Sequence, residues 1–390
     1  MQTNFSKEFL SQPNGARANE ILRSCVHCGF CNATCPTYQL TGDELDGPRG
    51  RIYLIRDLLE AGENSPRAQN HLDRCLTCRA CETTCPSGVA YGELAEIARN
   101  TIGPQREGLQ GLYRRVLSYL IPKPKVLQPL VSIGRWFKWM LPRAFAKQIP
   151  ATLEQSNIPE NKDAQVLLLQ GCAQQVSTAN TNNHLAALLK ANDIAVTVDQ
   201  KEVCCGALDL HMGDEAKAIN LMQENVGNLS AYQTVVSSAS GCGVTYKEYG
   251  RLLGDKAREF STRVVDVSEY LTQLIKAGQF VAKARYPEKK VAWHSPCTLQ
   301  HGQQVVDQVE QILTAAGYRL VTVADAHLCC GSAGTYSILQ PELSEQLQRN
   351  KVRNLQKQQP DYIATANVGC QTQIAQAADV PVLHWIELLE

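Results

Sequence analysis

The sequence of 390 residues lacks the features that would assign it to several common classes of protein. Its 38 basic and 38 acidic side chains cancel, so it has no basic excess for nucleic-acid binding. The N-terminal stretch is polar, without the apolar core of a signal peptide. No apolar run reaches the ~20 residues of a membrane-spanning helix. We therefore expect a cytoplasmic protein that binds no nucleic acid.

Loops that hold nucleotide cofactors are also missing. The Gly-x-Gly at Gly241 and Gly243 lacks the third glycine of a dinucleotide fingerprint, and residues 331–334 do not match a phosphate-binding loop. The chain therefore has no evident flavin or nicotinamide site. Together with the many cysteines described next, this absence favours an electron conduit whose substrate chemistry takes place on a partner.

Cysteine, in contrast, is abundant, with sixteen residues. Without a secretory signal, this number indicates a reducing compartment and metal ligation rather than disulfides. Two runs near the N-terminus, CVHCGFCNATCP and CLTCRACETTCP, share the spacing C-x2-C-x2-C-x3-C-P. That spacing is typical of two-cluster ferredoxins, in which three neighbouring thiolates bind one [4Fe–4S] cluster and the fourth crosses to the other.

The crossed arrangement predicts two ligand sets. The first cluster is assigned to Cys25, Cys28, Cys31 and Cys85, and the second to Cys75, Cys78, Cys81 and Cys35. Zinc sites and disulfides are the alternatives, because C-x2-C pairs occur in both. Four ligands satisfy zinc, however, and an eight-cysteine repeat is unusual for it.

Around these runs the apolar pattern predicts helices rather than β-hairpins. A short helix is expected over residues 16–24, and another within residues 47–62, where Gly62 marks its end. Pro66 is expected to start a third helix, which leads to Cys75. We expect an α-helical ferredoxin-like domain over residues 1–105.

Residues 106–162 form a basic connecting segment that is rich in proline and aromatic side chains. Eight basic and no acidic residues lie between Arg114 and Lys147, together with Trp136 and Trp139. The prolines at positions 122, 124, 129, 142 and 150 are expected to break any long amphipathic helix. Docking to a protein partner, peripheral membrane contact through residues 114–147 and a plain linker remain alternatives, in that order.

The remainder of the chain contains an internal duplication. Cys172, Cys204 and Cys205 recur 125 positions later as Cys297, Cys329 and Cys330, and Cys242 recurs 128 positions later as Cys370. Each half alternates strand-like runs with helical segments, which predicts a parallel sheet with covered faces. We expect two α/β cysteine-rich domains, over residues 163–285 and 286–390.

The cysteines of each half follow strand-like runs. In a parallel sheet, ligands bind beyond the carboxyl ends of the strands, so four thiols per half are expected to gather at one rim. Gly206 and Gly331, which follow the paired cysteines, would allow a positive φ or a close backbone approach. A further metal or iron–sulfur site is the favoured interpretation, with redox-active dithiols and inert packing as the alternatives.

The histidines are less informative. We assign no catalytic acid or base among His184, His211, His294, His301, His327 and His384. His294 and His327 closely precede cysteines, where they could hydrogen-bond a cluster, but a partly buried histidine with ordinary partners is the favoured interpretation. His384 and Trp385 are expected to pack in a terminal helix.

With these residues placed, the sequence closely resembles the iron–sulfur subunits of bacterial glycolate oxidase. The resemblance runs nearly end to end, through GDELDGPRGRIYLI, CCGALD, ASGCGVTYKEYG, CTLQHGQQ, AHLCCGSAGTY, TANVGCQT and HWIEL as well as the two cysteine runs. The repeated CCG halves also resemble the CCG-containing subunits of heterodisulfide reductase and of anaerobic glycerol-3-phosphate dehydrogenase, and lactate-utilisation proteins.

The resemblance implies a three-subunit complex in which flavin-bearing partners oxidise glycolate to glyoxylate. This chain would relay electrons toward a quinone, peripherally on the cytoplasmic face of the inner membrane, without binding the hydroxy acid itself. The alternatives are an iron–sulfur subunit of a lactate or glycerol-3-phosphate dehydrogenase and a heterodisulfide-reductase-like catalytic subunit. In the heterodisulfide reductase pattern each CCG half ends in C-x2-C. The last cysteine of that pair is replaced here by Thr245 in the first half and by Gln373 in the second, which argues against a five-thiolate cluster.

Overall fold

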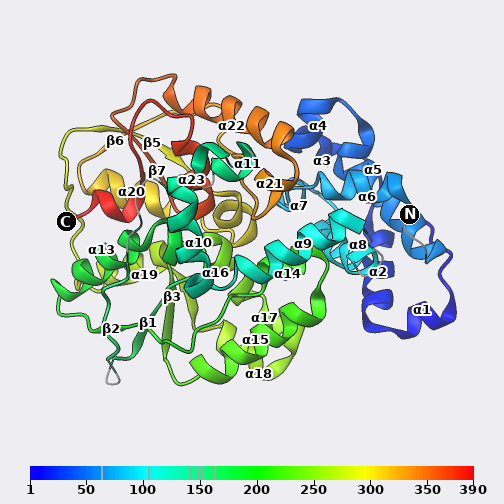
Figure 1. The fold of residues 1–390 in the computed structure, drawn as a ribbon, viewed down its shortest axis with the longest axis horizontal. Helices are drawn as coiled ribbons and strands as arrows, with labels where there is room; N and C mark the ends of the chain where they lie inside the picture. The colour runs from blue at the N-terminus through cyan, green and yellow to red at the C-terminus, as the bar shows by residue number, and fades with distance from the viewer. Residues whose placement is uncertain are drawn as a thin grey trace.

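The computed structural model describes residues 1–62, 65–103, 106, 108–140, 143–147, 149–150, 153, 155–161 and 164–390. Figure 1 shows the N-terminal helices gathered at one side of the molecule and the two sheets at the other, with α9 between them. The predicted order of a helical domain followed by two repeated α/β units is confirmed.

The N-terminal region is entirely helical where it has regular structure in the described residues. Its elements are α1 Lys7–Ser11, α2 Pro13–Ser24, α3 Phe30–Ala33, α4 Pro36–Thr41, the 3-10 turn η1 Glu44–Asp46, α5 Pro48–Ala61, α6 Pro66–Asp73, α7 Ala80–Thr83 and α8 Tyr91–Ile102. Proline opens four of these helices, where its missing N–H leaves no bond unmade. Gly62 ends α5 with a left-handed φ of 70°. The three helices predicted here are confirmed.

Two parallel four-stranded sheets make up the rest of the fold. The first consists of β1 Val166–Leu169, β2 Val196–Thr197, β3 Thr234–Ser237 and β4 Val264–Asp266, and the second of β5 Lys290–His294, β6 Arg319–Val321, β7 Tyr362–Thr365 and β8 Val382–His384. The strand orders, β2-β1-β3-β4 and β6-β5-β7-β8, are the same. The duplication seen in the cysteines therefore extends to the topology.

Helices cover the faces of both sheets. The first half contains α12 Gln174–Ser177, α13 Ala179–Lys190, α14 Ala207–Met212, α15 Glu215–Leu229, α16 Ser240–Lys247, α17 Tyr249–Leu253, α18 Asp255–Ser261 and α19 Val267–Lys276. The second contains the π-helical turn η4 Thr298–Gly302, α20 Gln308–Ala315, α21 Tyr336–Leu339, α22 Pro341–Gln356, α23 Val368–Ala375 and the 3-10 turn η5 Trp385–Leu388.

The last strand of each sheet was not predicted. β4 and β8 lead directly into α19 and η5 with no turn residue between, so their apolar residues were not separated from the helical ones. The expectation that His384 and Trp385 pack in a terminal helix is therefore wrong for His384, which is the last residue of β8. Trp385 begins the turn η5 and is fully buried.

The connecting segment folds into α9 Gly108–Leu120, α10 Pro124–Trp136, the 3-10 turn η3 Lys138–Met140 and α11 Arg143–Ala146. Pro122 and Pro124 separate α9 from α10, but Pro129 lies inside α10, so the expectation that it breaks the helix is wrong. As the sixth residue of α10, it removes only one early intrahelical bond. Pro142 lies outside the described residues. No helix in the described ranges is long and apolar enough to cross a membrane.

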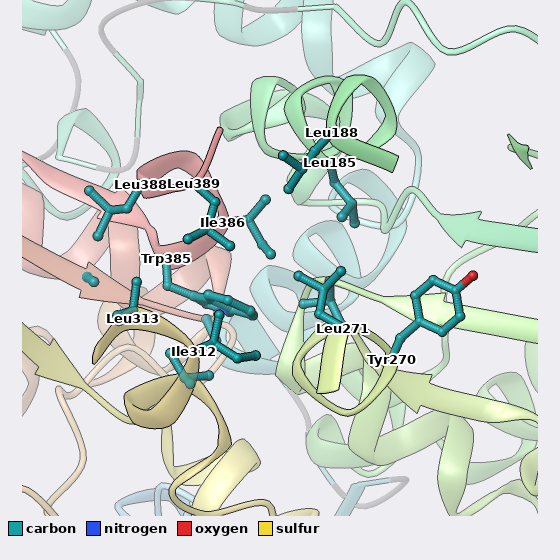
Figure 2. Close-up of a cluster of buried hydrophobic side chains, with 14 of the residues drawn as sticks. Leu185, Leu188, Tyr270, Leu271, Ile312, Leu313, Trp385, Ile386, Leu388 and Leu389 are labelled. Carbon is teal, nitrogen blue, oxygen red and sulfur yellow. The ribbon is translucent and has the colours of Figure 1, made fainter. Parts of the chain in front are cut away.

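The two sheet-containing halves share one hydrophobic core. Figure 2 shows the C-terminal turn and its flanking residues between α20 of the second half and helices of the first. Its labelled members are Leu185, Leu188, Tyr270 and Leu271 from the first half and Ile312, Leu313, Trp385, Ile386, Leu388 and Leu389 from the second. The bounds of the four domains remain predictions, and residues 105, 162 and 163 lie outside the described residues.

Because Trp385 fills this shared core, Trp385→Ala should lower the free energy of unfolding by about 3–5 kcal/mol. Trp136→Ala is the matched control, since Trp136 is 84% exposed and its truncation leaves no cavity. Thermal unfolding of both variants measures the difference. Equal losses of stability would contradict the assignment of Trp385 to the core.

Candidate metal centres

Both N-terminal cysteine runs form loops with the same unusual backbone. His27 and Gly29 flank Cys28 with φ of 57° and 85°, and Thr77 and Arg79 flank Cys78 with φ of 53° and 60°. Three of these four residues are not glycine, so the conformation is strained and must be held by its surroundings. The positive φ angles on either side of the middle cysteine curl each loop. In the second loop, the Thr77 amide donates to Cys75 Sγ at 3.4 Å.

A cavity that opens to solvent lies under the first run. The thiols that line it are Cys25, Cys28, Cys31, Cys81 and Cys85. The set predicted for the first cluster therefore surrounds one space, with Cys85 supplied by the second run. Cys28 is exposed, and Val26 and Phe30 beside it are 68% and 61% exposed.

A second cavity is lined by Cys35, Cys75, Cys78 and Cys81. This is the predicted second set, with Cys35 crossing from the first run. Cys81 borders both cavities, so the two spaces are neighbours. The two lining sets reproduce the crossed pattern in which three ligands come from one run and the fourth from the other.

The second cavity lies beside buried positive charge. Arg51 is 1% exposed, and its Nη1 lies 3.9 Å from Cys35 Sγ while Nε donates to the His71 carbonyl at 2.8 Å. Arg99 is also buried and donates to the Cys75 carbonyl at 2.7 Å. Burial raises the pKa of the Cys75 thiol, but Arg51 and Arg99 outweigh burial, so this pKa lies below its ordinary value.

The other thiols at these cavities behave differently. Burial raises the pKa of Cys31 to about 11, and it raises the pKa of Cys78 and Cys81 well above the ordinary value. Metal ligation needs the thiolate, so binding at these positions displaces protons. These thiols are therefore expected to stay protonated until an electrophilic iron centre occupies the cavity.

Arg51 was not predicted from the sequence, although a signal was present. It occupies the buried face of α5 together with Ile52, Ile55, Leu58 and Leu59. A lone arginine within an apolar stripe is rarely buried without a charged or polar partner. Such an arginine, placed between two cysteine runs, could have been identified as a counter-charge for thiolates.

The predicted gathering of thiols in each half is observed. Cys172 Sγ lies 3.6 Å from Cys204 Sγ, and Cys297 Sγ lies 3.9 Å from Cys329 Sγ. The paired cysteines are buried, and the glycines after them, Gly206 and Gly331, have φ of 86° and 88°, as expected for glycine at a tight turn.

The thiols of the second half lie against the second cavity. Cys78 and Cys297 are partly buried in the small apolar cluster that contains Leu76 and Cys329. Burial is the main cause of the raised pKa of Cys78, and the nearby Cys297 thiol adds to it because two negative charges would repel. One rim of the duplicated region is therefore continuous with the predicted cluster domain.

The two residues that replace the last cysteine of the reductase pattern have other partners. Thr245 Oγ1 donates to the Gly241 carbonyl at 3.2 Å. Gln373 Nε2 donates to Ser344 Oγ at 2.8 Å, and the Gln373 carbonyl accepts from Gln348 at 2.5 Å. Both side chains support the local fold, which leaves four thiols in each half.

The histidines divide into two groups. His184, His301 and His384 lie within hydrogen-bonding distance of backbone carbonyls. His294 differs, since it is 2% exposed and neither ring nitrogen has a partner. The expectation that His294 is partly buried with ordinary partners is therefore wrong. Burial lowers the pKa of His294 well below its ordinary value, so its imidazole is neutral.

Comparison with protein families agrees with this architecture. Residues 21–89 match the 4Fe-4S dicluster domain, and residues 166–247 and 291–375 each match the cysteine-rich domain called CCG. These ranges contain the two cysteine runs and the duplicated halves. The chain is therefore an iron–sulfur protein with a dicluster domain and a repeated cysteine-rich domain.

Whole-chain comparisons identify the family. The chain is 42% identical to the glycolate oxidase iron-sulfur subunit of Escherichia coli K12, over 100% of this chain and 98% of the relative. It is 30% identical to the probable glycolate oxidase iron-sulfur subunit of Bacillus subtilis 168, over 90% and 88%. A solved structure of a hypothetical protein from Helicobacter pylori shares the fold at 8% identity, with a TM-score of 0.58 over 98% of this chain and 74% of that one. The chain belongs to the family of glycolate oxidase iron-sulfur subunits.

Proposed function

We propose that this chain receives electrons from a flavin-bearing partner that oxidises glycolate to glyoxylate, and passes them toward a quinone. The observation that supports this best is the pair of adjacent thiol-lined cavities. The names of the E. coli and B. subtilis relatives supply the substrate and the membership of a complex. No residue of this chain is assigned to binding the hydroxy acid.

The ligand assignment is part of the proposal. Cys25, Cys28, Cys31 and Cys85 would hold one [4Fe–4S] cluster, and Cys75, Cys78, Cys81 and Cys35 the other. When bound, these clusters supply one-electron chemistry that accepts the two electrons of a reduced flavin one at a time. The residues present fit the groups, because each cavity is bordered by the four thiols that a cubane cluster needs.

The first cavity is proposed to face the flavin-bearing partner. It opens to solvent at Cys28, whereas the second cavity lies against the duplicated halves. Val26 and Phe30 present exposed apolar surface at that opening. Apolar surface around an exposed redox ligand suits a docking face, since a partner must exclude water and come close.

The buried arginines give the two sites different electrostatics. Arg51 and Arg99 lie beside the second set of thiols, and positive charge stabilises the more negative, reduced state of a cluster. We therefore expect the second site to have the higher reduction potential. Electrons arriving at the exposed first site would then move inward favourably.

Helices α9 and α10 are proposed to contact the membrane that holds the quinone. The exposed apolar residues of α9 are Leu109, Leu112, Val116 and Tyr119, and those of α10 and the residue after it are Val126, Leu130, Ile133, Trp136 and Phe137. Their spacing of mostly three and four places each set along one face of its helix. Trp139 and Met140 in η3 extend this exposed surface.

The charge of this segment supports lipid as the occupant of this surface. Eight basic and no acidic residues lie between positions 114 and 147, of which Arg114 and Lys147 pair with Asp73 and Glu345. Apolar side chains in the headgroup layer, surrounded by basic residues, are typical of peripheral helices on anionic membranes. The location on the cytoplasmic face of the inner membrane is proposed on the same grounds.

The relay predicts that Cys28→Ser separates the two half-reactions of the complex. Stopped-flow measurements should show flavin reduction by glycolate at an unchanged rate, while reduction of a quinone analogue falls by at least about a hundredfold because a cluster ligand is lost. Ser24→Ala is the control, because it changes a nearby residue of the preceding helix that is not a cluster ligand. If flavin reduction failed together with quinone reduction, the relay role would be wrong.

The electrostatic argument predicts that Arg51→Gln lowers the reduction potential of the second cluster and leaves that of the first unchanged, because a buried positive charge beside Cys35 is removed. Arg49→Gln is the matched control for the second cluster, since Arg49 is partly exposed, pairs with Glu44 and borders the first cavity instead. Redox titration followed by EPR measures both potentials. If both variants shifted the reduction potential of the second cluster by the same amount, the assignment of Arg51 as its counter-charge would be wrong.

The membrane proposal predicts that exchanging Lys123 and Lys125 for glutamine weakens binding to vesicles containing phosphatidylglycerol by about tenfold or more, since each basic residue near an anionic surface contributes about 1 kcal/mol. The same exchange at Lys289 and Lys290, in the second half, should have little effect. Co-sedimentation measures binding, with phosphatidylcholine vesicles as the neutral reference. Equal losses in both double variants would exclude this surface as the membrane contact.

A further inference from the structure

The two duplicated halves differ at one buried position beside their thiols. β1 ends at Leu169 and β5 ends at His294, and these residues are equivalent in the two sheets. Leu169 pairs in register with Ser237 of β3, and His294 pairs with Thr365 of β7. The same place in the fold therefore holds an apolar side chain in the first half and an imidazole in the second.

The imidazole of His294 has no hydrogen-bond partner in the described structure. The side chain is 2% exposed, and both ring nitrogens are buried and unpaired. Buried polar groups are nearly always paired, so such an orphan needs an explanation. An unprotonated ring nitrogen is a good metal ligand, and a bound ion would satisfy it.

The surrounding atoms have the spacing of a metal site. The ligand atoms of His294, Cys330 and Cys370 all lie within 4.8 Å of one another. Cys329, adjacent to Cys330 in the chain, lies with its Sγ 3.9 Å from Cys297 Sγ. Ligand atoms of a tetrahedral zinc site are separated by roughly 3.5–3.8 Å, as follows from bond lengths of about 2.0–2.3 Å. His294, Cys330 and Cys370 therefore form the close group, and the fourth donor would come from the neighbouring Cys297 and Cys329 pair, of which Cys329 interacts with Cys330.

The charge near these thiols suits one divalent ion. Three thiolates and a zinc ion leave a single negative charge. Lys351, which is 2% exposed, lies near Cys329, Cys330 and Cys370, and donates to the Asp325 carbonyl at 2.8 Å. One buried ammonium group therefore offsets the charge of one such centre.

We propose that the second half binds one zinc ion through His294, Cys330, Cys370 and one thiolate of the Cys297 and Cys329 pair. A Cys3His set with four protein ligands has no open position, so the ion is structural and not catalytic. It would hold together the rim that lies against the second cluster cavity. The first half, with Leu169 at the equivalent position, lacks the nitrogen ligand and has no centre of this kind.

This inference is independent of the proposed electron relay and is tested on the intact complex, purified without added metal and without oxygen. Metal analysis should give about one zinc per copy of this chain. Absorption spectroscopy at the zinc edge, which iron does not disturb, should show three sulfur ligands at about 2.3 Å and one nitrogen at about 2.0–2.1 Å. His294→Ala should lower the zinc content at least about fivefold while the iron content stays the same.

Two further variants complete the test. His294→Cys should retain zinc and change its ligands to four sulfurs, so it gives an answer even if His294→Ala does not fold. His327→Gln, a histidine of the same half two residues before Cys329, should retain zinc with unchanged ligands. The proposal is overturned by a complex without zinc, by four sulfur ligands in the unchanged protein, or by His294→Ala removing iron instead of zinc.

Discussion

The crowding of thiols inside small cavities is the constraint on which the rest of this structure depends. Thiolates that face one another repel and lose their hydration, so helices can enclose them only where positive charge is supplied. Iron supplies most of that charge when it is bound, and the buried Arg51 and Arg99 add to it beside the second cavity. Folding of the N-terminal domain and metal binding are therefore expected to be coupled.

The pairing of crowded thiols with buried positive charge continues where the N-terminal domain meets the second half. The second cluster cavity borders the thiols of the second half, where a further buried cation, Lys351, lies. The first half is joined to the second through a shared core centred on Trp385, which fixes the two sheets relative to each other (Figure 2). The thiol sites are thus held by a continuous packed interior and not by flexible linkers.

Duplication gave two similar sheets, but the side chains beside the thiols have diverged. Leu169 and His294 occupy equivalent strand ends, and only the histidine can bind a metal. Thr245 and Gln373 replace the same cysteine of a related pattern, and both are bound to the local backbone or to neighbouring side chains. The halves share a scaffold, therefore, while their chemistry differs.

Much of this arrangement could be predicted from the sequence. The cysteine spacing predicted the thiols that line two neighbouring cavities, while their role as cluster ligands stays a prediction. Proline and glycine marked the ends of α5 and α6. β4 and β8 were missed because each runs directly into helical residues with no turn between them. Pro129 was misjudged because one lost bond does not break a helix.

Burial was harder to predict than secondary structure. Whether His294 finds a hydrogen-bond partner depends on which distant segments pack against it, and neighbouring residues in the sequence do not contain that information. The orphaned ring of His294 therefore became visible only in three dimensions. Arg51 was different, because its place in the apolar stripe of α5 was a signal that could have been used.

The most direct measurement of the central claim is the iron and acid-labile sulfide content of the complex, purified without oxygen and combined with EPR after reduction. Two [4Fe–4S] clusters predict about eight irons and eight sulfides per copy of this chain, with signals from two interacting clusters. A folded, assembled complex with fewer than about four irons per chain and no EPR signal after dithionite would contradict the account.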